Sequence, residues 1–184
     1  MLLAEYQQCL IKTSHRGLVV LVGDPLWHLT QIKQYLAANN HHINNVLAYG
    51  NSSLFQELSE SKIPSNLSEI TDKNYRHFLG IDSDCIIYQS DDIHPDVFAA
   101  ISGTLRAGGI FFLLLEKYPN NESTYYLQRF YRAIEESFIS FYVYQDVTKL
   151  SCSKQRPKQK LTNQSEIIAH NQRCINYLKA KASS

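Results

Sequence analysis

Long apolar runs and an excess of one charge are missing from this 184-residue sequence. The longest unbroken apolar run, Ile110–Leu115, is far short of the roughly 20 residues that a membrane-spanning helix needs. The formal net charge is only +1, so the overall composition gives no sign of affinity for nucleic acids or membranes. We therefore expect a soluble, cytoplasmic chain without a membrane partner, in which any charged binding surface is local.

Paired cysteines and a secretion signal are also missing. The four cysteines, Cys9, Cys85, Cys152 and Cys174, lie far apart and form no CxxC pair. This spacing favours reduced thiols over a disulfide framework or a zinc site, and we expect no metal. The segment 1–16 mixes acidic and amide side chains with its leucines, so we interpret it as an amphipathic helix and not as a signal peptide.

The motifs of common cofactor sites are absent as well. No GxxxxGK[ST] loop occurs. A dinucleotide or S-adenosylmethionine site needs a glycine-rich turn after the first strand and an acidic side chain after the second strand. Here the first predicted strand ends in VLVGDPLWH and the second in LAYGNSS, with one glycine at each end and no carboxylate after the second. We expect no cofactor in this chain; a free-standing small-molecule enzyme of methyltransferase-like fold is the alternative.

Short apolar runs alternate with helical patterns along the chain. Strands are predicted at residues 17–22, 44–49, 84–89, 110–115 and 139–144. Helices are predicted at residues 1–16, 28–38, 52–60, 73–80, 94–108, 123–138 and 162–182, with a polar connection at 61–72. This alternation predicts the α/β class: a Rossmann-like three-layer sandwich with a mainly parallel sheet of about five strands, plus a C-terminal helix. The run 110–115 is apolar on both faces, so we expect a central strand with Phe112 and Leu114 buried.

Individual residues indicate where these helices begin and end. Ser52 or Ser53 is the expected cap of helix 52–60. Gly80 and Gly108 are the expected stops of the two helices that precede them, because glycine readily adopts the left-handed conformation. Gly109 would then let the chain turn directly into the apolar strand.

The chain divides into three predicted parts. Residues 1–148 form the Rossmann-like domain, and residues 149–160 form a basic linker without apolar periodicity. Residues 161–184 form a helix that either folds back on the domain or leads toward an ATPase domain absent from this chain.

Four stretches together resemble a known family. The longest is YRHFLGIDSDCIIYQSDDIHPDVFAAISGTLRAGGIFFLLLE, and HRGLVVLVGD, YYLQRFYRAI and LTNQSEIIAHNQRCI follow the same order. They are similar to the N-terminal domain of the tRNA(Met) cytidine acetyltransferase family, whose members continue into a helicase-like ATPase domain, a GNAT-type acetyltransferase domain and a tRNA-binding tail. Two departures occur: Gln89 stands where many relatives have aspartate, and Glu116-Lys117 stands where they have proline.

The resemblance implies a function for the whole enzyme. That enzyme would transfer an acetyl group from acetyl-CoA to the N4 amine of a cytidine in the tRNA anticodon, using ATP with Mg. The family's ATP and acetyl-CoA segments match no residue of this chain, so we expect this chain alone to be non-catalytic. Its expected role is assembly with the ATPase and acetyltransferase domains, positioning of the ATPase domain, or auxiliary contact with RNA.

The most credible binding feature is the basic run of the linker. Lysine and arginine neutralise phosphates without reading bases. The candidate RNA contacts are Lys149, Lys154, Arg156, Lys158 and Lys160, with Arg129 and Arg132 beside Tyr125, Tyr126 and Tyr131. Trp27 could stack on a base or simply pack against the core.

Two further clusters have simpler interpretations. Asp91, Asp92, His94 and Asp96 follow the third predicted strand, where α/β proteins usually place ligands, but they also suit a solvated turn and helix cap. The His41-His42 pair has no further ligand at metal spacing, so we interpret it as an exposed loop.

Overall fold

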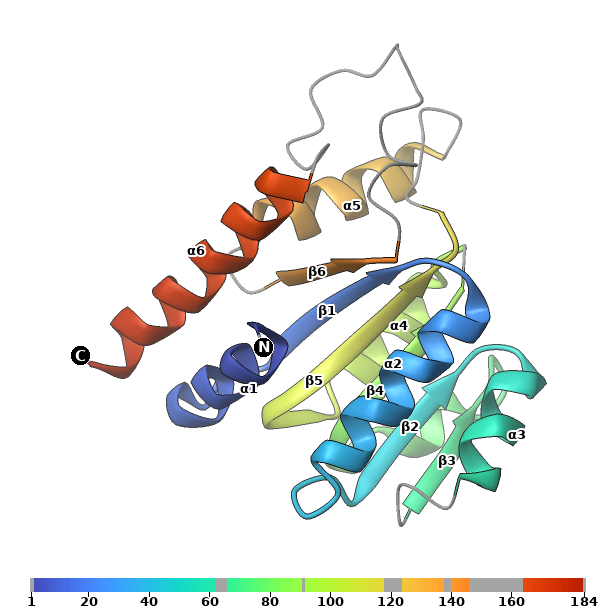
Figure 1. Ribbon diagram of the computed structural model, residues 1–184. Coiled ribbons are helices and arrows are strands. Elements are labelled where there is room, and N and C mark those ends of the chain that lie inside the picture. Colours follow the sequence, from blue (N-terminus) through green and yellow to red (C-terminus); the bar gives the residue numbers. More distant parts are fainter. Residues whose placement is uncertain are drawn as a thin grey trace.

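The computed structural model describes residues 2–61, 66–90, 92–117, 124–137, 140–145 and 164–183. Among these residues, six parallel strands form one open sheet in the order β3-β2-β4-β5-β1-β6. The predicted α/β fold with a mainly parallel sheet and a C-terminal helix is confirmed, and the sheet has one strand more than predicted (Figure 1).

The bounds of the elements are close to those predicted, with exceptions described below. The strands are β1 (Gly17–Val22), β2 (Asn45–Tyr49), β3 (Asn66–Ile70), β4 (Ser83–Gln89), β5 (Leu105–Leu115) and β6 (Ser140–Tyr144). The helices are α1 (Leu2–Thr13), α2 (Pro25–Ala38), α3 (Ser52–Glu60), the 3-10 helix η1 (Tyr75–Phe78), α4 (Pro95–Ser102), α5 (Tyr125–Glu136) and α6 (Gln164–Ala182). None of the described helices is both long and apolar enough to cross a bilayer.

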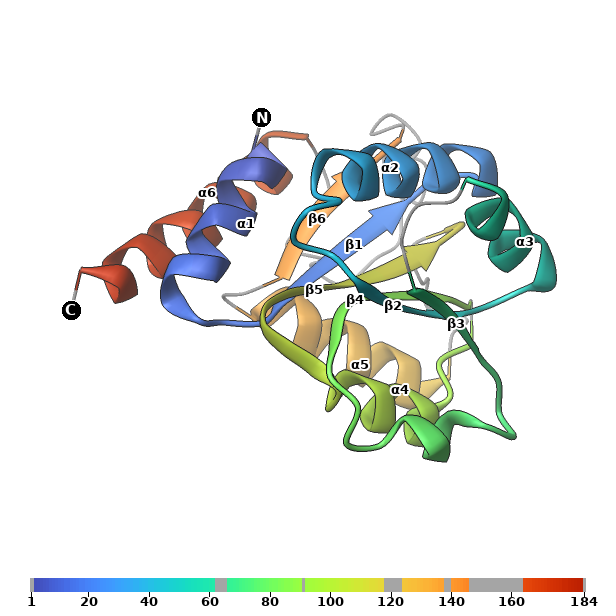
Figure 2. The same cartoon turned by 90° about the horizontal axis from the view of Figure 1, so that it is seen from below.

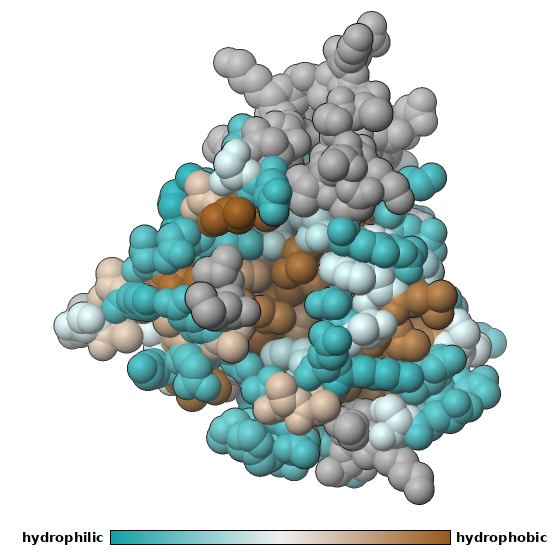
Figure 3. All heavy atoms as spheres, viewed as in Figure 1, coloured by the Kyte–Doolittle hydropathy of each residue, from teal (hydrophilic) through white to brown (hydrophobic). Residues whose placement is uncertain are grey.

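Helices cover both faces of the sheet, as a doubly wound fold requires. Helices α1, α2 and α3 lie over one face, α4 and α5 lie over the other, and α6 lies along the β6 edge and contributes side chains to both cores (Figure 2). Leu3, Trp27, Leu29 and Val143 are only partly buried against the core of the first face. Figure 3 shows hydrophobic side chains reaching the surface in the middle of that face, between hydrophilic rims.

Strand β5 lies inside the sheet, between β4 and β1. Phe112 and Leu114 point into the core shared with α1 and α2, whereas Phe111 and Leu113 point into the core shared with α4 and α5. Burial on both faces explains the unbroken apolar run of this strand. Phe112 and Leu114 are each 1 % exposed, so the prediction that both are buried is confirmed.

Two segments before the third predicted strand differ from the sequence-based prediction. The polar connection contains strand β3, an edge strand that pairs only with β2. Its side chains are mostly half-buried or exposed, so it lacks the apolar run by which the other strands were recognised. The cap of α3 is Asn51, whose side chain accepts a hydrogen bond from the Leu54 N–H, and not Ser52 or Ser53.

The predicted helix 94–108 was too long. Helix α4 ends at Ser102, and Thr104 Oγ1 donates to the Ile101 carbonyl and contacts Ser83 Oγ at 3.0 Å. Strand β5 therefore begins at Leu105, and Gly108 lies within it at φ 79° instead of ending a helix. Gly80 adopts φ 84° after η1, which is a short 3-10 helix where an α-helix was expected.

Helix α6 folds back on the domain and lies beside α1 and β6 (Figures 1 and 2). The Asn171 side chain makes two hydrogen bonds to the edge strand β6. Its Oδ1 accepts from Tyr142 N at 2.9 Å, and its Nδ2 donates to Tyr142 O at 2.7 Å. Asn171 thus replaces the next strand of the sheet and covers an otherwise open edge.

Three of the four cysteines lie within the described residues. Cys9, Cys85 and Cys174 are buried and free, as expected for reduced thiols, and Cys152 lies outside the described residues. Burial raises the pKa of the Cys174 thiol to about 11, so this thiol is held protonated at neutral pH.

Candidate functional site

The carboxyl end of β1 is closed by the chain's own side chains. Asp24 N donates to Gln145 Oε1 at 2.7 Å, and Gln145 Nε2 donates back to Asp24 Oδ2. Asp24 Oδ1 also accepts from Trp27 N at 2.9 Å and so caps α2. The hydrogen bonds from the Trp27 N–H and then Gln145 hold the pKa of the Asp24 carboxyl below its usual range.

The same side chains lie close to Gly23, directly after β1. A Cβ atom added to Gly23 would lie 2.6 Å from Gln145 Oε1 and 2.6 Å from the Trp27 ring. Gly23 N donates to the Leu115 carbonyl at 3.0 Å instead of pointing toward a ligand. The turn after β1 is therefore packed against β5 and β6 and lacks the open backbone of a dinucleotide-binding loop.

The carboxyl ends of β2 and β4 are also packed together. A Cβ atom added to Gly50 would lie 2.9 Å from Gln89 Cβ. Asn51 Oδ1, the first side-chain oxygen after β2, accepts from Leu54 N and Ser53 Oγ, both at 2.9 Å. The position that holds ribose hydroxyls in dinucleotide-binding proteins thus carries a helix cap and no carboxylate.

Two tyrosines lie beneath this edge. The Tyr49 and Tyr88 rings stack at 4.6 Å, and Tyr49 OH donates to Asp72 Oδ1 at 2.8 Å. His94 N donates to Tyr88 OH at 3.0 Å. Burial raises the pKa of Tyr88 to about 12, so the phenol stays protonated and serves the packing of the loop before α4.

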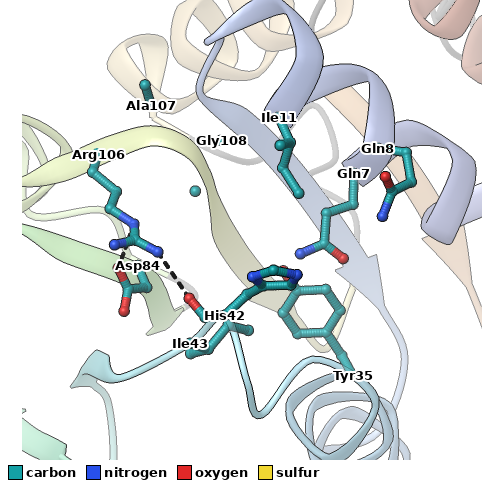
Figure 4. A pocket seen from close by; sticks show the side chains of 11 residues that line it. Gln7, Gln8, Ile11, Tyr35, His42, Ile43, Asp84, Arg106, Ala107 and Gly108 are labelled. Carbon is teal, nitrogen blue, oxygen red and sulfur yellow. Dashed lines mark hydrogen bonds and ion pairs between the residues drawn. The ribbon is translucent and has the colours of Figure 1, made fainter.

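A pocket of ≈ 220 Å³ lies at the opposite edge of the sheet, near the amino ends of β4 and β5. It lies among α1, α2, the loop after α2, and the starts of β4 and β5 (Figure 4). Its lining residues are Gln7, Gln8, Ile11, Tyr35, His42, Ile43, Asp84, Arg106, Ala107, Gly108 and Gly109.

A buried carboxylate joins the elements around this pocket. Asp84 Oδ2 accepts from Asn44 N at 2.6 Å and from Asn45 N at 2.9 Å, while Asp84 Oδ1 pairs with Arg106 Nε at 2.5 Å. Arg106 Nη2 also donates to the His42 carbonyl at 2.8 Å. Asp84 is buried, but the Arg106 side chain is 47 % exposed and forms part of the pocket wall.

The last two glycines of the SGTLRAGG string, Gly108 and Gly109, are required by this packing. Gly108 has φ 79°, and an added Cβ would lie 3.3 Å from Ile11 Cγ1 of α1. A Cβ on Gly109 would lie 2.8 Å from the Asp84 carbonyl oxygen. The strand register shifts between Ser83 and Cys85, beside these glycines. They therefore allow an irregular strand start against which α1 packs.

Some of the residues predicted to contact RNA lie on the described helices α2 and α5, and the others lie outside the described residues. Arg129 and Arg132 are exposed on α5, together with Tyr125, which is 76 % exposed. Trp27 packs partly against the core and contacts the His28 ring, which favours its interpretation as a packing residue. The basic residues Lys149, Lys154, Arg156, Lys158 and Lys160 lie outside the described residues, so their prediction stays untested.

The aspartate cluster after β4 and the His41-His42 pair lie wholly or partly within the described residues. Asp92 and His94 are exposed, His94 precedes the first turn of α4, and Asp91 lies outside the described residues. His41 and His42 are exposed with ring centroids 4.3 Å apart. Within the described part of the chain, no three His, Cys, Asp or Glu side chains are grouped as a metal site.

Sequence reasoning missed the pocket at the amino edge. Its residues come from segments far apart in the sequence, and the only signal was the RAGG string at 106–109. That string was interpreted as a helix end, whereas it forms one wall of the pocket (Figure 4).

Comparison with known proteins gives one family. No curated protein matches the chain significantly. The family model for the N-terminal domain of tRNA(Met) cytidine acetyltransferase TmcA matches residues 1–146, which include α1 to α5 and every strand of the described sheet. The match covers well over half of the chain, and the chain therefore belongs to the family of tRNA(Met) cytidine acetyltransferase TmcA N-terminal domains.

Proposed function

We propose that this chain is a non-catalytic module of a tRNA cytidine acetyltransferase and that it contacts tRNA directly. The family match supports the enzyme context. The observation that supports the non-catalytic part is the turn after β1, where contacts among Gln145, Asp24 and Trp27 replace the open glycine-rich backbone of a dinucleotide-binding loop. Acetyl-CoA, ATP and Mg then belong to other domains of the enzyme, and no residue of this chain is assigned to them.

The RNA contact is proposed on exposed cations. Arg129 and Arg132 are three residues apart on the exposed side of α5, and Tyr125 lies one turn before Arg129. No ion pair within the described residues engages either arginine. Two exposed guanidinium groups beside an exposed aromatic ring suit a phosphate backbone and an adjacent base.

The basic run of residues 149–160 follows β6, and α5 directly precedes that strand in the chain. Its five cations would add phosphate contacts that do not depend on base sequence. We propose that the run and α5 serve one RNA-binding region of the module.

Fluorescence anisotropy with labelled tRNA at two salt concentrations tests this proposal. Three variants are compared with the parent chain: one with Lys154, Arg156, Lys158 and Lys160 changed to Ser, one with Arg129→Ser and Arg132→Ser, and a control with Lys73→Ser and Lys117→Ser. The first two should bind more weakly and lower the log–log salt slope by roughly 0.7–0.9 for each lost phosphate contact. Curves identical to the control would show that neither segment contacts RNA.

A further inference from the structure

We propose that the pocket at the amino edge binds one unpaired nucleotide of RNA. The base would lie between α1 and His42, and a neighbouring phosphate would lie on Lys12 and Arg16. This inference rests on the proposed contact with tRNA and assigns it a second, more specific surface, at the edge of the sheet opposite the closed carboxyl end.

The pocket is lined by both polar and apolar residues, and its two charged side chains, Asp84 and Arg106, are paired with each other. The Asp84 carboxylate is balanced by Arg106 and accepts two further hydrogen bonds from Asn44 N and Asn45 N. Arg106 in turn is engaged by both Asp84 and the His42 carbonyl. A phosphate or carboxylate inside the pocket would therefore compete with an existing ion pair, whereas a neutral base would not.

The remaining side chains suit a planar heterocycle with donors and acceptors. Gln8 supplies an exposed carboxamide with two N–H donors and one acceptor oxygen, whereas Gln7 is buried and its carboxamide hydrogen-bonds to Tyr35. Figure 4 shows Gln7 and Ile11 pointing from α1 toward His42 and Tyr35. Ile11 is 42 % exposed, and the His42 ring is also exposed, so an apolar surface and an aromatic ring are both accessible. Single-stranded RNA is typically bound by such stacking combined with hydrogen bonds to base edges.

Two exposed cations, Lys12 and Arg16, are close in sequence to residues that line this pocket. Lys12 lies one helical turn after Gln8 and directly after Ile11 on α1. Arg16 follows His15, whose carbonyl accepts a hydrogen bond from Gly108 N at 2.8 Å. Neither Lys12 nor Arg16 belongs to an ion pair within the residues that the structure describes. Both are therefore available to a phosphate next to the bound base.

Titration of the ¹⁵N-labelled chain with the four nucleoside 5′-monophosphates locates the site. Side-chain amide signals of Gln7 and Gln8, and backbone signals of residues 41–43 and 106–109, should shift together on addition of at least one nucleotide. The backbone signals of α3 should stay in place. Shifts confined to α5, or shifts that inorganic phosphate alone reproduces, would overturn the base pocket.

Binding of a single-stranded RNA hexamer by anisotropy then tests the residues. His42→Ala and Gln8→Ala should each weaken binding, and loss of the stacking ring should cost about five- to a hundredfold. Lys12→Ser with Arg16→Ser should weaken binding and lower the salt slope. The matched controls are His77→Ala, at an exposed histidine on η1, and Lys73→Ser with Lys117→Ser. Each variant must keep the thermal unfolding midpoint of the parent.

The outcomes separate this inference from the proposed function. Absence of tRNA binding to the parent chain would overturn both. Binding of tRNA that the Gln8, His42, Lys12 and Arg16 variants leave unchanged would overturn the pocket alone and leave the contact on α5. The pocket would instead be a protein interface under two conditions. The pocket variants would bind RNA as well as the control variants do, and the NMR signals of the pocket would shift only when the ATPase domain of the enzyme is added.

Discussion

Asp84 is the single residue that connects most elements at the amino edge. Its carboxylate joins the start of β4 to the start of β2 through two backbone N–H groups and to β5 through Arg106. Because the carboxylate is buried, its charge is tolerated only with all of these donors in place.

Asp84→Ala should therefore lower the free energy of unfolding by about 2–4 kcal/mol, mainly because the N–H groups of Asn44 and Asn45 lose their acceptor. Arg106 is half exposed and can regain water, so it adds little to this cost. Urea unfolding measures the change. Asp82→Ala, at an exposed neighbour, is the control, and an equal effect of both changes would contradict the role assigned to Asp84.

Single residues also show where sequence reasoning succeeded and where it did not. The burial of Phe112 and Leu114 followed from an apolar run that is unbroken on both faces. The predicted role of Gly108 as a helix end was wrong, because its positive φ occurs at an irregularity within strand β5. A glycine pair indicates unusual backbone conformation, but only the contact with Ile11 shows which element demands it.

Helix α6 is the element whose role is least visible in the sequence. Its polar residues Asn171 and His170 face the edge strand β6, where they bond to Tyr142 and Ser140. A helical pattern predicts the helix, but such polar residues look like a solvated face until the strand beside them is known. Strand β3 was not predicted for a similar reason: its side chains are mostly half-buried or exposed and lack the apolar pattern of an interior strand.

Asn171→Leu should expose the edge of the sheet without changing the size of the side chain greatly. The N–H and carbonyl of Tyr142 would each lose a buried partner, at a cost of about 2–4 kcal/mol together. We expect a lower urea midpoint and a greater tendency to aggregate, because open edge strands pair with other chains. The neighbouring Gln172→Leu is the control, and light scattering after mild heating measures aggregation. Equal scattering by the Asn171→Leu and Gln172→Leu variants would contradict this role of α6.

The docking of α6 should also depend on pH. Burial, and then Arg173, lower the pKa of His170 below its ordinary value of 6.5, while its hydrogen bond to the Ser140 carbonyl opposes this shift. The neutral ring is therefore favoured in the folded chain. Stability from His170 is complete above pH 6.5 and is lost as the pH falls from 6.5 toward the lowered pKa.

Urea unfolding at pH 7.5 and pH 5.5 measures this dependence. The parent should lose more stability between the two values than a His170→Gln variant, while His77→Gln, at an exposed histidine, should behave like the parent. A His170→Gln variant with the full pH dependence of the parent would show that other groups cause it.

At the scale of the whole molecule, the two edges of the sheet differ in kind. The carboxyl end of β1 is closed by hydrogen bonds between Gln145 and Asp24, and the amino edge holds an accessible pocket with both polar and apolar lining residues. The general α/β architecture could be predicted from the alternation of apolar runs and helical patterns. The pocket could not, because it depends on which distant segments the strand order brings together.

The closed edge predicts that this chain binds neither S-adenosylmethionine nor NAD. A ligand at that edge would have to displace Gln145 and break its hydrogen bonds with Asp24. Isothermal titration calorimetry should show no heat of binding for either compound. Micromolar binding of S-adenosylmethionine would instead support the alternative of a free-standing small-molecule enzyme of methyltransferase-like fold.

The central claim is that this module contacts tRNA through defined surfaces, and hydrogen–deuterium exchange of the chain with and without tRNA tests it most directly. We predict slower exchange at residues 7–16, 39–45 and 105–109, and at the start of α5, with no change in α3. Protection should disappear at high salt, because phosphate contacts weaken as counterions compete. Exchange that tRNA leaves unchanged over the whole chain, at low salt and saturating tRNA, would contradict the claim.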